Sequence, residues 1–429
     1  MIRFIYNLFW LLGLLVFLPG YIAKMIRRGG YREKFGQRLG IYDRAVSNRL
    51  SNGRSTWLHA VSVGEVNIAL KLANALRRLE PDLQCVLTTT TTTGFALARK
   101  TAPPWIEVMY TPLDYWPIMR RALSVIRPAR IVLIEAEVWP NLAAAAHARR
   151  VPLALVNARL SPRSERRYRR FRFFVAPTFR LLDLVCVPEQ LDVERWTALG
   201  VARNRIHVTG SIKFDPDVQT QSDTLGASGV NGFSPNSLVL FGGSTHRGEE
   251  EILARIFLRL REEFPSLRLF IAPRHVERLQ EIRAQLCALP LRVSLASERV
   301  GQGVGDADCM LLDTTGELQR WYTIATVVYI GKSLTAHGGQ NPVEPILAGK
   351  PVVFGPHMEN FATLAQTLVS SSAAMQVNDI ESLEGAVAEL LRDNKACQRL
   401  VQNAHGVLSE HHGATERTAK LIHGLGSRL

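Results

Sequence analysis

The stretch Gly331–Phe361, GKSLTAHGGQNPVEPILAGKPVVFGPHMENF, carries more structural information than any other part of the chain. It begins at the end of a β-branched run, passes through the turn Ala336–Gly339, and continues into a short helix and a second apolar run. Asn341 suits the cap of this helix, Pro342 suits its first position, and Glu344 completes an N-x-x-E capping box. Free N–H groups and the helix dipole attract negative charge at such a turn. The stretch therefore predicts an α/β unit with an anion site, in which Glu344 serves as a cap, as a ligand contact, or as both.

Short apolar runs alternate with amphipathic segments over most of the chain, which is typical of βαβ units with parallel sheets. The expected strands are Trp57–Val61, Gln84–Thr89, Ile106–Tyr110, Arg130–Ile134, Leu153–Asn157, Leu184–Val187, Leu238–Gly242, Leu267–Ala272, Leu291–Leu295, Cys309–Leu312, Val327–Ile330 and Pro351–Phe354. The alternation stops at Gln219–Asn236, a Ser/Gly/Asp-rich segment that is typical of a linker. We therefore expect two doubly wound domains, residues 45–218 and 237–429, facing a cleft where ligands collect at strand C-termini. The last helix is expected either to close the second domain or to cross back to the first.

Composition narrows the class of protein. The 429 residues are 47% hydrophobic and 21% charged, as in an ordinary globular protein. The net charge of +14 indicates a polyanionic partner, which is a nucleic acid, an anionic membrane face or a phosphorylated substrate. The five cysteines are scattered, without a C-x-x-C pair or a Cys/His cluster, so the sequence predicts neither a disulfide framework nor a zinc site.

The N-terminal segment Phe4–Ala23 is uncharged and rich in Leu, Phe and Trp. A helix of this length just crosses a hydrocarbon core of roughly 30 Å. No small-residue cleavage site follows, and a cluster of lysines and arginines begins at Lys24, which predicts an uncleaved membrane anchor within residues 1–30 and a cytoplasmic main body. Pro19-Gly20 leaves open whether the anchor spans the membrane or lies half-buried in one leaflet.

Three candidate catalytic residues follow apolar runs of the first half. Glu65 ends HAVSVGE (59–65), where Ser62-x-x-Glu65 also fits a simple capping box. Glu135 and Glu137 follow the run that ends at Ile134, and strand alternation allows only one of them to face a site. Lys213, in TGSIKFD (209–215), lies between two apolar residues and could stabilise the negative charge of a leaving group, although a surface lysine is the simpler interpretation.

The second half has three polar segments between expected strands and helices. GGSTH (242–246) has glycine amides that could hold a phosphate, PRH (273–275) places Arg274 and His275 for phosphate or base contacts, and DTTGEL (313–318) could meet a ribose or base. Each pattern is weak when taken alone.

The segment Arg159–Arg180 contains eight arginines and a single acidic residue, with aromatic residues between them. It could bind nucleic acid, lie on an anionic leaflet, hold a phosphorylated glycolipid, or be a solvated basic surface. The expected membrane anchor favours a phosphorylated lipid over RNA.

Taken together, these motifs resemble those of one enzyme family. GGQNPVEP (338–345) is similar to the GGHNPLE motif of 3-deoxy-D-manno-octulosonic acid (Kdo) transferases, and S-x-G-E, E-x-E-x-W-P-N, G-S-x-K-F-D, G-S-T-H, P-R-H and D-T-x-G-E-L occur in that family's order. The resemblance runs from the N-terminal segment to at least Phe361. Gln340 departs from it, because histidine is commoner there, and this bears on contacts to the donor.

The resemblance implies a GT-B fold, with two Rossmann-like domains and an N-terminal anchor helix, and an inverting transfer of Kdo from CMP-Kdo to the lipid A precursor (lipid IVA). It implies Glu65 as general base, Glu135 as support for the transition state and Lys213 for leaving-group charge. It places the donor on Pro273, Arg274, Thr315, Gly316, Glu317, Asn341, Pro342, Val343 and Glu344. It further implies no metal ion, no cofactor and no nucleic-acid partner, and a location on the cytoplasmic face of a bacterial inner membrane, against its anionic leaflet.

Two alternatives belong to different classes. One is another GT-B transferase that uses a UDP-sugar, and the other is a non-catalytic, membrane-tethered protein that binds anions. Turnover that depends on Glu65 distinguishes an enzyme from a binding protein, and a screen of donors distinguishes the two transferases.

Overall fold

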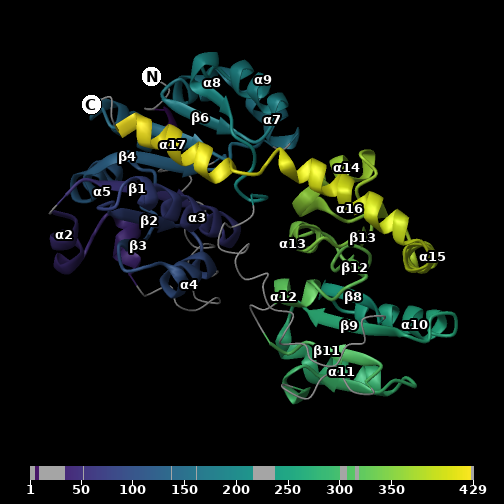
Figure 1. The fold of residues 1–429 in the computed structure, drawn as a ribbon. Helices are drawn as coiled ribbons and strands as arrows, with labels where there is room; N and C mark the ends of the chain where they lie inside the picture. Colours follow the sequence, from purple (N-terminus) through teal and green to yellow (C-terminus); the bar gives the residue numbers. More distant parts are fainter. Residues whose placement is uncertain are drawn as a thin grey trace. The chain divides into compact units, whose positions relative to one another are not determined.

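The computed structural model describes residues 5–8, 34–51, 53–136, 138–160, 162–215, 237–299, 307–314 and 318–426. The chain divides into two compact units (Figure 1). Unit 1 comprises Met1–Asp215 together with His411–Leu429, and unit 2 comprises Pro216–Glu410.

Unit 1 is built around a parallel sheet with the strand order β3-β2-β1-β4-β5-β6-β7. Its strands are β1 (Ser55–Ala60), β2 (Cys85–Thr89), β3 (Ile106–Tyr110), β4 (Pro128–Ile134), β5 (Leu153–Val156), β6 (Leu184–Val187) and β7 (Ile206–Val208). Its helices are α2 (Arg44–Ser51), α3 (Val63–Leu79), α4 (Thr92–Thr101), α5 (Trp116–Ile126), α6 (Pro140–Ala148), α7 (Pro162–Arg170), α8 (Arg172–Phe179), α9 (Gln190–Ala198) and α17 (Ala414–Gly426).

Both faces of this sheet are covered by helices. Ile131 and Leu133 of β4 belong to one core cluster, whereas Val132 and Ile134 belong to the other. Because successive side chains of a strand point to opposite faces, β4 is apolar throughout and fully buried. The switch in chain order between β1 and β4 marks the edge where ligands of such sheets bind.

The C-terminal helix α17 belongs to unit 1, where it packs on α3 and β4 (Figure 1). Asp215 and the segment around Gly413 meet where the chain leaves unit 1 and where it returns. The Asp215 carboxylate accepts hydrogen bonds from the amides of Gly413 and Thr415, both at 2.7 Å. Ser211 adds a backbone N–H bond to Nδ1 of His411 at 3.3 Å.

Unit 2 contains a second parallel sheet, with the strand order β10-β11-β9-β8-β12-β13-β14. Its strands are β8 (Leu238–Thr245), β9 (Leu267–Pro273), β10 (Val293–Leu295), β11 (Cys309–Leu311), β12 (Val327–Ile330), β13 (Val352–Phe354) and β14 (Met375–Gln376). Its helices are α10 (Glu249–Leu260), α11 (Leu279–Cys287), α12 (Leu318–Tyr322), α13 (Val343–Leu347), α14 (Ala362–Ser370), α15 (Ile380–Arg392) and α16 (Asn394–Ser409).

Every apolar run that we expected to form a strand does so, with ends that differ by three residues or fewer. The two doubly wound α/β sheets are thus confirmed. The edge strands β7 and β14 were not predicted, because three and two residues are too few to show a periodic pattern.

The expected anchor, Phe4–Ala23, lies almost entirely outside the described residues. A single turn at residues 5–8 is described, and there Asn7 and Asn141 exchange side-chain amide hydrogen bonds of 3.0 Å. Within the parts of the chain that the structure describes, we find no helix with the length and apolar character needed to span a bilayer. The expected linker Gln219–Asn236 lies outside the described residues as well.

Candidate functional site

Glu65 lies in the first turn of α3, directly after the carboxyl end of β1. Its side chain is buried, with 7% exposure, and each carboxylate oxygen has a defined donor. Oε2 accepts from the Val61 amide at 2.8 Å, and Oε1 accepts from the Ser62 hydroxyl at 2.9 Å. Ser62 Oγ also accepts weakly from the Glu65 amide, at 3.4 Å. The predicted Ser62–Glu65 cap is present, and it fixes the direction of the carboxylate.

Glu135 follows β4, the strand next to β1 in the sheet. Its φ of 62° lies in the left-handed region, which costs a non-glycine residue roughly 1 kcal/mol or more. The strained conformation is held by a 2.9 Å bond from the Glu135 amide to the Val156 carbonyl of β5. Asn157, which follows β5, shares this feature with a φ of 51°. Strain of this kind is typical of functional sites, and it supports Glu135 as a candidate. Glu137 lies outside the described residues.

Lys213 lies within electrostatic range of Glu135 and Arg159. Burial lowers the pKa of the Lys213 ammonium, the Glu135 carboxylate raises this pKa, and the Arg159 guanidinium lowers it further. The backbone here is fixed by Asn157, whose Oδ1 accepts from the amide of Ile212 at 3.1 Å. The structure thus brings together Lys213 and Glu135, which are far apart in sequence, and adds Arg159, which we had assigned only to the basic stretch.

His59 was not predicted as a functional residue, and the structure buries it at the carboxyl end of β1. Burial lowers the pKa of its imidazole to about 4, so the ring is neutral at pH 7. Nδ1 contacts the Thr88 hydroxyl at 3.1 Å, and Nε2 has no hydrogen-bond partner among the described residues. The ring also meets Trp139 edge-on, with ring centres 5.6 Å apart. His59 is therefore a buried, neutral ring that packs against Thr88 and Trp139 at the carboxyl edge of the sheet.

In unit 2, Arg274 and Glu344 lie within electrostatic range of each other. Burial raises the pKa of the Glu344 carboxylate, whereas a hydrogen bond from Asn341 and the charge of Arg274 lower it. The Asn341 amide donates to Glu344 Oε1 at 3.0 Å. Pro273 ends β9, directly before exposed Arg274. The structure thus brings together Pro273, Arg274, Asn341 and Glu344 in one unit, whereas Thr315, Gly316 and Glu317 lie outside the described residues.

The capping details predicted for this helix need correction. Helix α13 begins at Val343, so Pro342 occupies the cap position and Asn341 precedes it. Asn341 Oδ1 accepts from the Val343 amide at 3.0 Å, and Glu344 bonds to the Asn341 side chain. Asn341 thus binds the first helical amide, but the reciprocal backbone bonds of the expected N-x-x-E box are not formed.

The glycine pair Gly242-Gly243 serves a different purpose from the one we expected. Both residues lie inside β8, which is paired on both sides. A Cβ at Gly242 would lie 2.5 Å from Leu253 Cδ1, and one at Gly243 would lie 2.5 Å from the Tyr322 hydroxyl. These glycines thus make room for packed side chains. The amide of His246, three residues after Gly243, donates to the Glu249 carboxylate at 2.8 Å.

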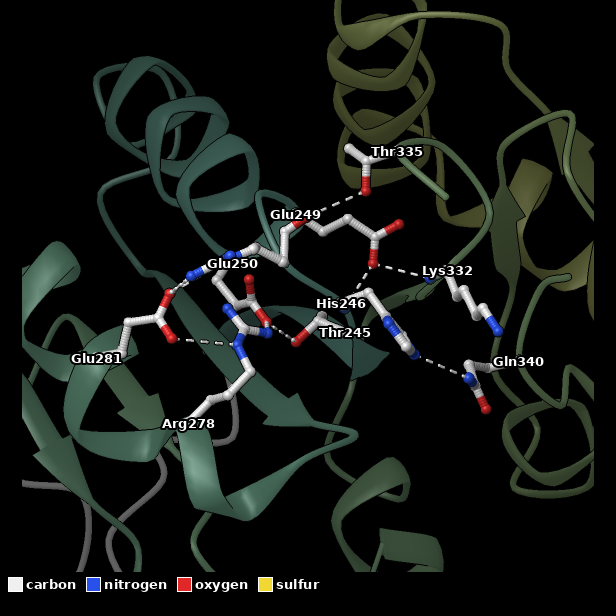
Figure 2. Close-up of polar contacts among 10 residues, drawn as sticks. Thr245, His246, Glu249, Glu250, Arg278, Glu281, Lys332, Thr335 and Gln340 are labelled. Carbon is white, nitrogen blue, oxygen red and sulfur yellow. Dashed lines mark hydrogen bonds and ion pairs between the residues drawn. The ribbon is translucent and has the colours of Figure 1, made fainter. Parts of the chain in front are cut away.

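Glu249 is the centre of a buried polar network that sequence reasoning missed (Figure 2). Its side chain is 1% exposed. Oε2 accepts from the amides of His246 and Lys332, each at 2.8 Å. Oε1 accepts from the Tyr329 hydroxyl at 2.7 Å and more weakly from the amides of Ser333 and Leu334. One carboxylate thus ties the turn after β8 to the loop after β12.

Imidazole and guanidinium groups surround this network. Arg278 donates to Glu250 Oε1 at 3.2 Å, and Glu250 also accepts from the Thr245 hydroxyl (Figure 2). His246 Nε2 lies 3.3 Å from the Gln340 amide nitrogen, and its ring meets that of His275 edge-on. Burial lowers the pKa of His246, and the charge of Lys332 lowers it further. This end of unit 2 thus places imidazole and guanidinium groups around the two buried carboxylates Glu249 and Glu250.

The basic segment forms α7 and α8. Arg166, Arg167, Arg169 and Arg170 are exposed. Phe171, Phe173 and Phe174 follow with exposures of 48%, 68% and 47%. Exposed phenylalanines beside exposed arginines form a surface that is both apolar and cationic.

Comparison with known proteins gives a consistent family. The family model of 3-deoxy-D-manno-octulosonic-acid transferases matches residues 33–216. The 3-deoxy-D-manno-octulosonic acid transferase of Haemophilus influenzae is 30% identical over 393 residues, which are 91% of each chain. That of Bordetella pertussis is 34% identical over 370 residues, covering 84% of this chain and 85% of that protein.

Two solved structures share the fold. The UDP-GlcNAc 2-epimerase of Neisseria meningitidis aligns with a TM-score of 0.58 at 12% identity, over 88% of this chain and all of that one. MurG of Acinetobacter baumannii aligns with a TM-score of 0.53 at 15% identity, over 87% of this chain and all of that one. These likenesses support a two-domain, GT-B-like α/β fold. The relatives from Haemophilus influenzae and Bordetella pertussis show that this chain belongs to the Kdo transferase family and is a glycosyltransferase.

Proposed function

We propose that this enzyme transfers Kdo from CMP-Kdo to the lipid A precursor, lipid IVA, with inversion at the anomeric carbon. In this reaction an acceptor hydroxyl attacks the anomeric carbon, CMP leaves, and a base takes the hydroxyl proton. The observation that carries the proposal is Glu65, a buried and oriented carboxylate at the carboxyl end of β1. Hydrogen bonds from the Val61 amide and the Ser62 hydroxyl aim this carboxylate, and a carboxylate held in place is the kind of group that a general base requires.

Glu135 and Lys213 have supporting roles in this proposal. The Lys213 ammonium neutralises charge on the departing phosphate; burial lowers the pKa of this group, and the neighbouring Glu135 carboxylate opposes that shift. Glu135 stabilises the positive charge that develops on the sugar, and its left-handed backbone conformation fixes the position of this side chain after β4.

The donor is assigned to unit 2. Arg274 is given to the phosphate, and Glu344 to the ribose hydroxyls, with Pro273, Thr315, Gly316, Glu317, Asn341, Pro342 and Val343 as the neighbouring wall. The proximity of Arg274 to Glu344, which their electrostatic coupling indicates, supports this assignment. The proposed reaction step includes no metal ion and no cofactor.

The acceptor is assigned to the basic surface of α7 and α8. Its exposed arginines suit lipid phosphates, and its exposed phenylalanines suit acyl chains or the interfacial layer of a membrane. We propose that the protein works on the cytoplasmic face of the bacterial inner membrane, held there by its N-terminal segment and by its net charge of +14.

The decisive experiment compares Glu65→Gln with Ser62→Ala. The glutamine keeps the shape of the cap but is not a base, whereas the alanine removes one partner of the same carboxylate and leaves the base in place. With CMP-Kdo and lipid IVA we expect turnover of Glu65→Gln to fall on the order of 100-fold or more, and that of Ser62→Ala to fall far less. CMP binding should be unchanged in both variants. Near-normal turnover of Glu65→Gln would remove Glu65 from the mechanism, and transfer from UDP-sugars but not from CMP-Kdo would refute the donor.

The acceptor assignment has its own test. Changing Arg166, Arg167, Arg169 and Arg170 to Gln should raise the apparent KM for the lipid in detergent micelles, where no leaflet is present. A dephosphorylated acceptor should give the parent enzyme a similarly raised KM. Unchanged micellar kinetics, together with weaker and salt-sensitive liposome binding, would assign these arginines to the membrane surface instead.

A further inference from the structure

His337, His357 and Glu359 come together on unit 2, outside the residues assigned to the reaction. His337 lies in the loop after β12, and the other two lie in the loop after β13. These strands are paired in parallel, so both loops leave the same edge of the sheet. The sequence predicts no metal site here, because twenty positions or more separate His337 from its two partners.

The side chains converge at a single carboxylate oxygen. His337 Nδ1 lies 2.9 Å from Glu359 Oε1, and His357 Nδ1 lies 3.5 Å from the same oxygen. The two imidazole rings are 4.0 Å apart, centre to centre. The potential ligand atoms of the three residues all lie within 4.8 Å of one another. Bonds of about 2.0–2.2 Å to a tetrahedral ion place ligand atoms roughly 3.4 Å apart, so small side-chain rotations suffice.

The second oxygen of Glu359 has a separate role. Oε2 accepts a hydrogen bond from the Gly338 amide at 2.6 Å. This bond orients the carboxylate so that Oε1 faces both imidazoles. Metal sites depend on such outer hydrogen bonds to aim their ligands.

The backbone that carries the three residues is fixed by contacts between the two loops. The His357 amide donates to the Ser333 carbonyl at 3.0 Å, and the Asn360 amide donates to the Gly338 carbonyl at 2.9 Å. Gly338 has a φ of 123°, and a Cβ there would lie 2.8 Å from the Asn360 amide nitrogen. The close approach of the loops therefore requires glycine at this position and does not depend on a metal.

From this geometry we propose that His337, His357 and Glu359 form a site for Zn²⁺ or a similar divalent transition-metal ion. Two imidazoles and one carboxylate suit zinc and its neighbours, whereas Mg²⁺ and Ca²⁺ prefer oxygen ligands alone. The side chain of His337 is 77% exposed, so solvent completes the coordination. The bound ion bridges the loops after β12 and β13, and it braces the turn that leads to Asn341. The alternative is a simple exposed His–Glu pair, which contributes little to stability.

The test is a Co²⁺ titration of the full chain, without an affinity tag and after washing with a chelator, followed by the visible absorption band of tetrahedral Co²⁺. We expect one equivalent to bind the parent and to be displaced by Zn²⁺. His337→Ala and Glu359→Gln should each weaken binding about tenfold or more. His337 is exposed, so its replacement should leave the metal-free melting temperature unchanged. His405→Ala, on the exposed face of α16, is the matched control and should bind as the parent does.

A parent without the band, or variants that bind Co²⁺ as tightly as the parent, would overturn the proposal. The readout does not require transfer activity, so this result is independent of the proposed reaction.

Discussion

Replacement of Glu249 by Gln tests how the loop after β12 is held. The variant has nearly the same shape, but one carboxylate oxygen becomes an NH₂ group. Whichever oxygen is lost, the new NH₂ group faces at least two donors, either the amides of His246 and Lys332 or the Tyr329 hydroxyl with the amides that follow it. A hydrogen bond to a charged acceptor contributes about 1.5–3 kcal/mol, so the loss of two such bonds should cost about 3 kcal/mol or more.

The assay is native-state hydrogen exchange, because a two-unit protein does not unfold in one step and local opening is the relevant quantity. A cost of about 3 kcal/mol corresponds to amide exchange that is about 100-fold faster in peptides covering residues 329–336. CMP affinity should fall as well, since the same loop leads to Asn341. The control is Glu251→Gln, whose exposed carboxylate pairs with Arg255 one helical turn away and should matter little. If residues 332–334 exchange at the parent rate in the Glu249 variant, this carboxylate does not hold the loop.

Three further predictions concern unit 1. The pKa of His59 is about 4 in the folded state and about 6.5 in the unfolded state, so between these pH values the unfolded state binds more protons. The free energy of unfolding therefore falls as the pH drops through this window. His59→Gln should remove about 3 kcal/mol of that loss, measured as a smaller fall in melting temperature between pH 7 and pH 4. Glu135→Gly should relieve its left-handed strain, so that the melting temperature rises slightly while turnover falls, and a fall in both would contradict the strain argument. Asp215→Asn keeps an acceptor oxygen for only one of the two amides, of Gly413 and Thr415, that Asp215 now binds, so proteolysis near these residues should be faster. Cleavage at the parent rate would show that these two hydrogen bonds are dispensable.

Local features of the sequence predicted local features of the structure. The partners of the Ser62–Glu65 cap are three positions apart, and both were already visible in the pattern S-x-x-E. The buried strands were recognisable in the same way, because β4 is apolar along its whole length. The Asn341 cap was wrong by one residue, as is common where a proline stands beside a helix start.

Features that depend on distant residues were not predictable. All donors to Glu249 except the His246 amide come from Tyr329 and from Lys332 and the residues after it, some eighty positions away, and no local pattern predicts them. The pair Gly242-Gly243 matched a phosphate-binding turn, but the side chains of Leu253 and Tyr322 fill the space beside it. Family resemblance supplied the roles of Glu65, Glu135 and Lys213, which neither periodicity nor the fold assigns, and these roles stay predictions until they are tested.

The hydrogen bonds of the Asp215 carboxylate to the amides of Gly413 and Thr415 have a consequence for protein engineering. The chain leaves unit 1 at Asp215 and re-enters at His411, and hydrogen bonds join the two junctions directly, so unit 2 is topologically a domain insertion. Residues 216–410 could therefore be exchanged for a short Gly/Ser connector without stretching the chain. Ala419 and Ile422 of α17 belong to the core of unit 1 and follow the insertion in the sequence, so the shortened chain would retain them. An excised unit 1 of this kind would present Glu65 and the basic surface of α7 and α8 without unit 2, and it would allow the proposed binding of the acceptor to be measured alone.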